Sequence, residues 1–306
     1  MIELAGLLPD EIAEAFRIEQ KFRAKQIFFG ISKGWVDFQK FNIPSDLRQE
    51  LISSAVVLSD KSGRRTLCVS SQVGCAMNCA FCKTGTLGFA RNLTASEIVA
   101  QFLLAEQIEG KIDNVVFMGM GEPLANLDNV LKAVAILTHK DGRNFSVRRF
   151  TVSTAGLVDK IEELANTGLA IKLAVSLTVA DENLRKQLMP VAGGFSLNRL
   201  RAAIDNYSRA SSRRVTLEIA LLSGVNTGDN YARALVEFCR GLNVHINLIR
   251  WNQVEGLPFE TPTSKEVDGF RRILEEGGLN VTVRMSRGKK ILGACGQLGK
   301  TNSELK

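Results

Sequence analysis

From Thr66 onward, short apolar runs alternate with longer amphipathic segments, and this alternation limits the possible folds more than any other feature of the sequence. Seven runs rich in Val, Ile, Thr and Phe predict strands: TLCVSSQV, NVVFMGM, RRFTVSTAG, IKLAVSLT, RVTLEIALL, HINLIRWN and NVTVRMS. Six segments with helical spacing separate them: ASEIVAQFLLAEQI, NLDNVLKAVAIL, LVDKIEELANTG, LNRLRAAIDNYSRA, NYARALVEFCRGL and SKEVDGFRRILEEGG. Strands that alternate with helices form parallel sheets with right-handed crossovers. The sequence therefore predicts an α/β fold, either a closed or partly closed (β/α) barrel or a doubly wound open sheet, with ligands bound at the carboxyl ends of the strands.

The residues before this alternation have a different pattern. The segments PDEIAEAF, KFRAKQIFFGISK and PSDLRQELIS show helical spacing with charges between the apolar positions, which predicts two or three short helices. The last residues, KTNSELK, are polar. We therefore expect a small N-terminal helical accessory domain over residues 1–65, an α/β barrel core over 66–299 and a polar tail over 300–306.

Composition excludes several classes of protein. With 306 residues, 45% of them hydrophobic and 23% charged, the chain can build a large core and is not of the disordered type. No apolar run is long enough to span a membrane, and the acidic N-terminal stretch does not resemble a signal peptide, so we expect a cytoplasmic protein. The net charge of +7 is compatible with a nucleic-acid partner. Only two histidines are present, which excludes a His-rich metal site.

Three cysteines lie close together in SSQVGCAMNCAFCKTG, directly after the first predicted barrel strand. In a chain without a secretory signal, clustered thiols indicate metal or redox ligands rather than disulfides. Cys75, Cys79 and Cys82 can hold three corners of an iron–sulfur cluster, with Gly74 providing the turn and Phe81 shielding the cluster. Structural zinc normally needs four protein ligands, and this stretch offers no histidine and no fourth cysteine. The spacing therefore predicts a four-iron cluster with one iron left open to an exogenous ligand.

The spacing of this triplet resembles that of the radical S-adenosylmethionine (SAM) superfamily, whose members use the open iron to hold the amino and carboxylate groups of SAM. The segment from Met118 to Pro123 follows the second predicted strand. Its glycines allow the backbone to approach a ligand, and Pro123 turns the chain away. A Gly-Glu-Pro turn is weak evidence when it stands alone, but its place one strand after the triplet predicts a site for the amino group of SAM.

A longer series of motifs resembles the RlmN/Cfr family of RNA adenine methyltransferases: LCVSSQVGC, FMGMGEPLANLDNV, RRFTVSTAGLV, KLAVSLTVADENLRKQLMPV, LLSGVNTGDNYA, HINLIRWN and RGKKILGACGQL. The match runs in order from about Phe22 to Leu298. The resemblance implies a partial (β/α) barrel of the radical SAM type, with Cys75, Cys79 and Cys82 as ligands of a [4Fe-4S] cluster. It also implies SAM contacts at seven positions: Gly121, Glu122, Ser153, Ser176, Leu177, Thr178 and Asn252.

The resemblance further implies an enzyme that methylates adenine carbon-2 in 23S ribosomal RNA, with transfer RNA as a further candidate substrate. Cys295 matches the cysteine that is S-methylated by one SAM and then attacked by a 5′-deoxyadenosyl radical from a second SAM. Cys68 matches the partner that releases the product by forming a disulfide with Cys295. An adenine ring carbon offers no nucleophile for polar methyl transfer, which explains the need for radical chemistry. The implied partners are RNA and an electron donor such as flavodoxin or ferredoxin, and we expect a monomer.

Basic residues are candidates for phosphate contacts. They are Lys21, Arg23 and Lys25 in the N-terminal helices, and Arg148, Arg149, Arg213, Arg214, Arg287, Lys289 and Lys290 in the core. Reaching an adenine edge requires an unstacked or flipped base. Cys239 matches nothing in the family and is predicted to be a core thiol.

Three positions depart from the family pattern. Ala55 stands where the family places a glutamate assigned as proton acceptor, and Asp60 is the nearest acid downstream. Thr178 replaces a histidine, and Lys290 replaces an aspartate close to Cys295. Three alternatives to carbon-2 methylation therefore stay open: a carbon-8 adenine methyltransferase of the Cfr kind, a radical SAM paralogue with a different substrate, and an RNA-binding protein with a vestigial cluster.

Overall fold

The computed structural model describes residues 4–33, 55–60, 62–284 and 297–298, and in this part of the chain eight strands form one curled sheet. Along the sheet the strands are β1 (Val56–Ser59), β2 (Arg65–Cys68), β5 (Asn114–Phe117), β6 (Phe150–Thr154), β7 (Lys172–Ser176), β8 (Val215–Leu221), β9 (Val244–Arg250) and β10 (Val281–Arg284). All neighbours from β2 to β10 pair in parallel, whereas β1 is an antiparallel edge strand.

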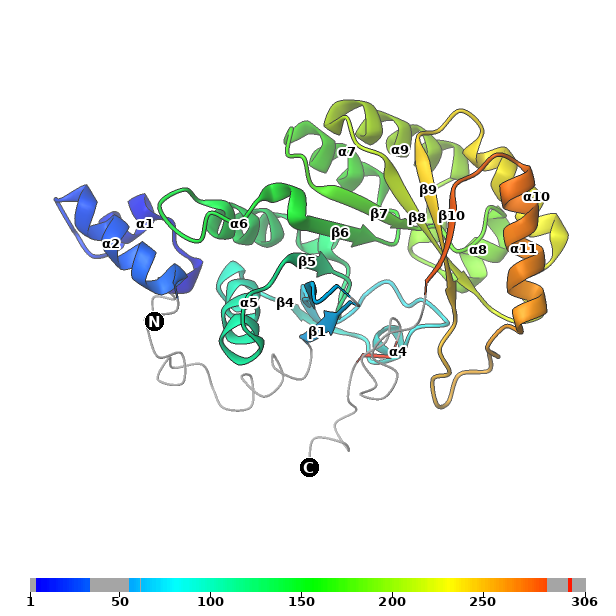
Figure 1. Ribbon diagram of the computed structural model, residues 1–306, viewed down its shortest axis with the longest axis horizontal. Coiled ribbons are helices and arrows are strands. Elements are labelled where there is room, and N and C mark those ends of the chain that lie inside the picture. Colours follow the sequence, from blue (N-terminus) through cyan, green and yellow to red (C-terminus); the bar gives the residue numbers. More distant parts are fainter. Residues whose placement is uncertain (1–3, 34–54, 61, 285–296, 299–306) are drawn as a thin grey trace.

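Six long helices run along the outside of the curled sheet (Figure 1). They are α5 (Ala95–Glu109), α6 (Leu127–Thr138), α7 (Val158–Asn166), α9 (Leu197–Ser211), α10 (Asp229–Cys239) and α11 (Ser264–Glu276). All seven predicted strands and six predicted helices are present. Because strand order follows chain order from β2 to β10 without a reversal, the sheet has no switch point of the doubly wound kind. The prediction of a partly closed α/β barrel is confirmed.

Local sequence signals define several helix starts. Thr94 and Glu97 form a capping box at the start of α5, in which each side chain accepts the other residue's backbone N–H, at 3.2 and 2.8 Å. Thr263 and Glu266 make the same exchange at the start of α11. These caps satisfy backbone donors that would otherwise lack partners, and they fix where each helix leaves the preceding strand.

The predicted strand TLCVSSQV is interrupted, and this corrects the prediction. β2 ends at Cys68, and the chain continues into β3 (Gln72–Gly74), which pairs with β4 (Phe89–Asn92) in a separate two-stranded sheet. The side-chain amide of Gln101 explains the break, because it accepts the N–H of Ser70 at 2.8 Å and donates to the carbonyl of Ser70 at 3.0 Å. A helix side chain thus replaces the neighbouring strand as the partner of this backbone.

The N-terminal region contains both helices and a strand. A short helical turn η1 (Leu4–Gly6) is followed by α1 (Pro9–Ala15) and α2 (Lys21–Ser32), while the predicted helix PSDLRQELIS lies outside the described residues. Buried Ile12, Phe28 and Ile31 join the main hydrophobic cluster of the barrel. The strand β1, which helical spacing did not predict, pairs with β2 at the edge of the sheet. No helix among the described residues is long and apolar enough to cross a membrane.

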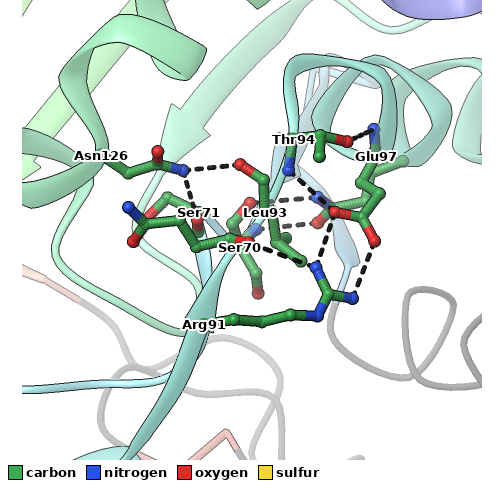
Figure 2. Close-up of polar contacts among 9 residues, drawn as sticks. Ser70, Ser71, Arg91, Leu93, Thr94, Glu97 and Asn126 are labelled. Carbon is green, nitrogen blue, oxygen red and sulfur yellow. Dashed lines mark hydrogen bonds and ion pairs between the residues drawn. The ribbon is translucent and has the colours of Figure 1, made fainter. Parts of the chain in front are cut away.

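A buried polar network holds the chain where it enters the cysteine-bearing loop (Figure 2). The side-chain nitrogen of Asn126 donates to the carbonyl of Ser71 at 2.8 Å and to that of Leu93 at 2.7 Å. Arg91 and Glu97 form a two-bond ion pair beside it, at 2.9 and 2.8 Å. The network joins β4, the start of α5 and the segment before α6. Because it also holds Ser71, it fixes the place where the chain enters the cysteine-bearing loop.

Replacing Asn126 with leucine is expected to destabilise the protein by about 2–4 kcal/mol, because two buried backbone carbonyls lose a donor that leucine cannot replace. The free energy of unfolding in urea measures this loss. Asn166→Leu, at an exposed position near the end of α7, is the matched control. Equal stability of the two variants would show that the network does not hold the loop.

Candidate active site

A cavity of about 190 Å³ lies at the carboxyl ends of the parallel strands. Its walls come from the cysteine-bearing loop and from the ends of the strands. The lining residues include Cys75, Met77, Cys79, Phe81, Cys82, Met118, Gly121, Glu122, Ser153, Thr154, Ser176, Thr178, Met189, Glu218, Trp251 and Arg284. This is the edge at which α/β barrels bind ligands, as the strand pattern predicted.

All three predicted cluster ligands line this cavity. Gly74 makes their loop possible, because it has a φ of +75° and a Cβ atom there would lie 1.9 Å from the carbonyl oxygen of Gly88. The N–H of Cys75 donates to the same carbonyl at 2.8 Å. On the other side of the loop, the indole N–H of Trp251 donates to the carbonyl of Phe81 at 2.7 Å. The loop is therefore tied to β4 at its start and to the end of β9 at its far side.

Without a nearby cation, the surroundings of Cys75 and Cys79 disfavour the thiolate form of these two side chains. Burial raises the pKa of Cys75 to about 11, and repulsion from Cys82 and Glu122 adds to the effect. Burial raises the pKa of Cys79 as well. Among the described residues no three His, Cys, Asp or Glu side chains converge on a position for one metal ion. Several soft thiol donors that line one cavity fit an iron–sulfur cluster, whose irons take one thiolate each and supply the positive charge.

Glu122 lines the same cavity as the thiols and is held by backbone donors. Its carboxylate accepts the N–H of Ala155 at 2.7 Å and that of Leu124 at 3.0 Å. Its own N–H donates to the side-chain oxygen of Gln72 at 2.9 Å. Complete burial raises the pKa of Glu122 to about 7 despite these hydrogen bonds. A buried carboxylate of this kind suits a cationic ligand group, such as an ammonium, which would complete its ionisation.

The Glu122 carboxyl predicts a pH dependence of stability in the iron-free protein. Its pKa is about 7 in the folded chain and about 4.5 when unfolded, so the folded state binds the proton more tightly. The resulting stabilisation is full below pH 4.5 and is lost as the pH rises through 7, by roughly 3 kcal/mol. Glu122→Gln should remove this dependence. Urea unfolding of both proteins between pH 5 and pH 8 tests it, and parallel curves would contradict the buried, protonated carboxyl.

Of the other predicted SAM positions, four line the cavity and two do not. Ser153 at the end of β6, Ser176 at the end of β7 and Thr178 line the cavity, as does Gly121. Leu177 is fully buried in the main core and is not among the residues that line the cavity. Asn252 is buried next to Trp251, but the cavity lining includes Trp251 rather than Asn252.

Cys68 lies outside the cavity lining, in a small apolar cluster with Val56, Met120 and Leu298. Leu298 also accepts a hydrogen bond from the hydroxyl of Thr84 at 2.7 Å, in the short helix α4 (Lys83–Thr86) that follows the cysteine triplet. Cys295 lies outside the described residues, three positions before Leu298 in sequence. Leu298, the last residue of the ACGQL motif, therefore lies beside Cys68 and is bonded to the short helix that follows the cysteine triplet.

The departures from the family pattern are visible in part. Ala55 is half-buried against the core beside β1, and Val56 pairs with Cys68, so position 55 carries no acid near this thiol. The carboxylate of Asp60 accepts hydrogen bonds from Ser62 and Arg64 within the β1–β2 turn. Arg287, Lys289 and Lys290 lie outside the described residues.

The predicted phosphate contacts in the described core do not surround the cavity. Arg148 and Arg149 precede β6, and Arg213 and Arg214 precede β8, so they lie at the amino ends of strands whose carboxyl ends form the cavity. Lys21, Arg23 and Lys25 are exposed on α2, where Lys25 forms an ion pair with Asp141 at 3.1 Å. Cys239 is buried in the main core, as predicted.

Sequence reasoning missed a buried acid in the cavity wall. Glu218 lies on β8, opposite Ser176 of β7 in the strand register. One carboxylate oxygen accepts from Asn247 at 3.0 Å and lies 3.6 Å from the guanidinium of Arg284, while the other has no hydrogen-bond partner among the described residues. Burial raises the pKa of Glu218. An acid within the apolar run VTLEIALL was the available signal for this residue.

Comparisons with known proteins agree with this geometry. The family model of the radical SAM superfamily matches residues 69–236. The chain is 46% identical to the "Probable dual-specificity RNA methyltransferase RlmN" of Treponema pallidum, over 97% of each chain, and 39% identical to the "Dual-specificity RNA methyltransferase RlmN" of Geobacter sulfurreducens, over 97% of this chain and 92% of that one.

A solved structure supports the same assignment. The crystal structure of a radical SAM methyltransferase from Sphaerobacter thermophilus superposes with a TM-score of 0.86 at 35% identity, covering 97% of this chain and 99% of that one. Cavity, sequence and superposition together show that this chain belongs to the radical SAM superfamily and, within it, to the RlmN/Cfr family.

Proposed function

We propose that this chain is a radical SAM methyltransferase that methylates carbon-2 of adenine in 23S ribosomal RNA and also accepts transfer RNA. The observation that carries the proposal is the joint lining of one cavity by three thiols and the buried Glu122 carboxylate. Members of the superfamily use a [4Fe-4S] cluster and SAM. The name of the relatives, which specifies dual specificity for RNA, supports two RNA substrates.

The roles of the residues follow from their places. Cys75, Cys79 and Cys82 would hold the cluster, and the carboxylate of Glu122 would bind the ammonium of SAM in the same cavity. When bound, the cluster and SAM supply a 5′-deoxyadenosyl radical. Met77, Phe81 and Trp251 provide apolar surface that excludes water from this reaction. Ser153, Ser176 and Thr178 line the same cavity and would contact the rest of SAM, with Asn252 and Leu177 next to lining residues in the chain.

Two further cysteines complete the proposal. Cys295 would hold the methyl group that passes to the base, and Cys68 would release the product by forming a disulfide with Cys295. The apolar cluster of Cys68 with Leu298 supports this pairing. The substitution of the family's glutamate by Ala55 leaves the proton acceptor open, and Glu218 is a described carboxylate in the cavity wall with an available oxygen.

The test is anaerobic reconstitution with iron, sulfide, SAM and a reductant such as reduced flavodoxin, followed by digestion and mass analysis of ribosomal and transfer RNA. We expect 2-methyladenosine, and we expect Cys295→Ala to abolish it. A product that comigrates with the 8-methyladenosine standard would instead identify a carbon-8 enzyme of the Cfr kind. Release of 5′-deoxyadenosine with unmodified RNA would indicate a different substrate, and SAM binding without 5′-deoxyadenosine would indicate a vestigial cluster.

A further inference from the structure

Arg185 is a buried cation without a carboxylate partner. It lies on α8 (Glu182–Leu188) and is only 1% exposed. Its two terminal nitrogens donate to the carbonyls of Ala192 and Ala155, each at 2.7 Å. Its third nitrogen, Nε, is buried and has no hydrogen-bond partner among the described residues, and no salt bridge joins the guanidinium to an acid in that part of the chain. Backbone carbonyls satisfy hydrogen bonds but carry no net charge.

Such a charge is expensive to bury. Arginine does not lose its proton inside a protein, so it cannot become neutral as a buried lysine or histidine can. An unpaired ion in the interior costs several kcal/mol after the protein has relaxed around it. The arrangement therefore calls for an anion that the side chains of residues 4–33, 55–60, 62–284 and 297–298 do not provide as a salt-bridge partner.

The surroundings of Arg185 indicate where that anion would lie. The guanidinium interacts electrostatically with the thiol of Cys79, which lines the cavity. The last carbonyl of α8, that of Leu188, accepts the N–H of Ala80 in the cysteine-bearing loop at 2.9 Å. The helix that carries Arg185 therefore also holds the loop that carries the thiols.

A second set of contacts links Arg185 to Glu122, which also lines the cavity. The residue Ala155, whose carbonyl binds the guanidinium, donates its N–H to the carboxylate of Glu122. The approach depends on Gly156, which has a φ of +102° and whose Cβ would lie 2.9 Å from the guanidinium. Arg185 is thus linked through Ala155 to Glu122, and through its own helix to the loop that carries the thiols.

We propose that Arg185 is the counter-charge of the anionic cluster held by Cys75, Cys79 and Cys82, and that it raises the reduction potential of this cluster. It is a positioning residue, since it acts through its charge and through the loop. A cluster with three thiolate ligands becomes more negative by one charge on reduction, and a fixed cation in a medium of low dielectric constant favours the reduced form. The inference rests on the proposed cofactor but not on the identity of the RNA substrate.

The test is the reduction potential of the reconstituted cluster, measured by reductive titration with electron paramagnetic resonance detection. For Arg185→Met we expect at least a tenfold fall in the equilibrium constant of reduction, which corresponds to about 59 mV for one electron. Arg185→Lys should stay within about threefold of the parent, because the negative charge of the adjacent cluster keeps the buried ammonium protonated, whereas methionine has no charge to keep. Lys186→Met removes an exposed charge from the same helix and should change the constant less than about twofold.

A second measurement separates this role from a purely structural one. If the guanidinium only anchors the carbonyls of Ala155 and Ala192, Arg185→Met should lose equal stability with and without iron. The proposal predicts a larger loss in the cluster-loaded protein than in the iron-free protein. A parent-like potential in Arg185→Met, or equal losses of stability in both forms, would overturn it. A failure to methylate RNA alone would bear on the proposed function and not on this inference.

Discussion

Cys79→Ala is expected to reduce the iron content of the reconstituted protein to background and to abolish formation of 5′-deoxyadenosine from SAM. The partly buried Cys79 side chain lines the cavity, and neither Met77 nor Phe81, which flank it in the loop and also line the cavity, offers a replacement donor. With only two thiols left in the triplet, the cluster loses a corner that it needs for stable binding. Iron and sulfide analysis, together with the visible absorption of the cluster, measures the loss.

The matched control is Cys239→Ala. Cys239 is also a buried thiol, but it lies in α10 within the main core and away from the cavity lining. This variant should lose some stability through the cavity that it creates while it binds the parent's amount of iron. If Cys79→Ala retained full iron content, the assignment of the triplet as cluster ligands would be wrong.

Gly121→Ala is expected to weaken SAM binding by about 30-fold to 900-fold, which corresponds to about 2–4 kcal/mol. Gly121 has a φ of +100°, and an added Cβ would lie 2.6 Å from the Cβ and 2.8 Å from the backbone nitrogen of Gln72. Gln72 cannot move away easily, because its side chain binds the N–H of Glu122 and its backbone N–H donates to the carbonyl of Met120. Backbone strain and overpacking together cost about 2–4 kcal/mol. Because Gln72 binds the N–H of Glu122, a shift of Gln72 or of the backbone at position 121 also displaces Glu122.

Gly168→Ala is the control for backbone strain at a glycine outside the cavity lining. Gly168 has a φ of +65°, but a Cβ added there would meet nothing within 4 Å, so alanine adds backbone strain without a collision. Equilibrium binding of SAM to the reconstituted proteins should be unchanged in Gly168→Ala. Parent-like affinity in Gly121→Ala would show that the Gly-Glu-Pro segment does not form the amino-group site.

The strands and helices could be predicted because their signals are local, since Val-rich and Ile-rich runs between amphipathic segments indicate them wherever they occur. These patterns left a doubly wound sheet open; the family resemblance implied a barrel, and the strand order without reversals confirms it. The break in TLCVSSQV could not be predicted in the same way. It depends on Gln101, which lies 31 residues away in sequence and competes for the backbone of Ser70. β1 likewise becomes recognisable only through its pairing with β2.

For the site as well, some residues could be predicted from local sequence and others could not. The spacing of Cys75, Cys79 and Cys82 and the Gly-Glu-Pro segment point to a cluster and to SAM because residues so close in the chain must share one loop. Whether Cys68 and Cys295 form a working pair stays a prediction. Arg185 shows the limit of such reasoning, since in ENLRKQL it differs little from its neighbour Lys186, yet one is buried and the other exposed.

Local patterns were therefore sufficient for the strands, the helices and the cluster motif, because short-range sterics, hydrogen bonding and burial periodicity produce them. Only the tertiary structure placed Glu218 in the cavity wall and buried Arg185 where it interacts electrostatically with Cys79. The reason is physical: the free energy of a buried charge depends on the charges and dipoles around it, and these come from segments far apart in the chain.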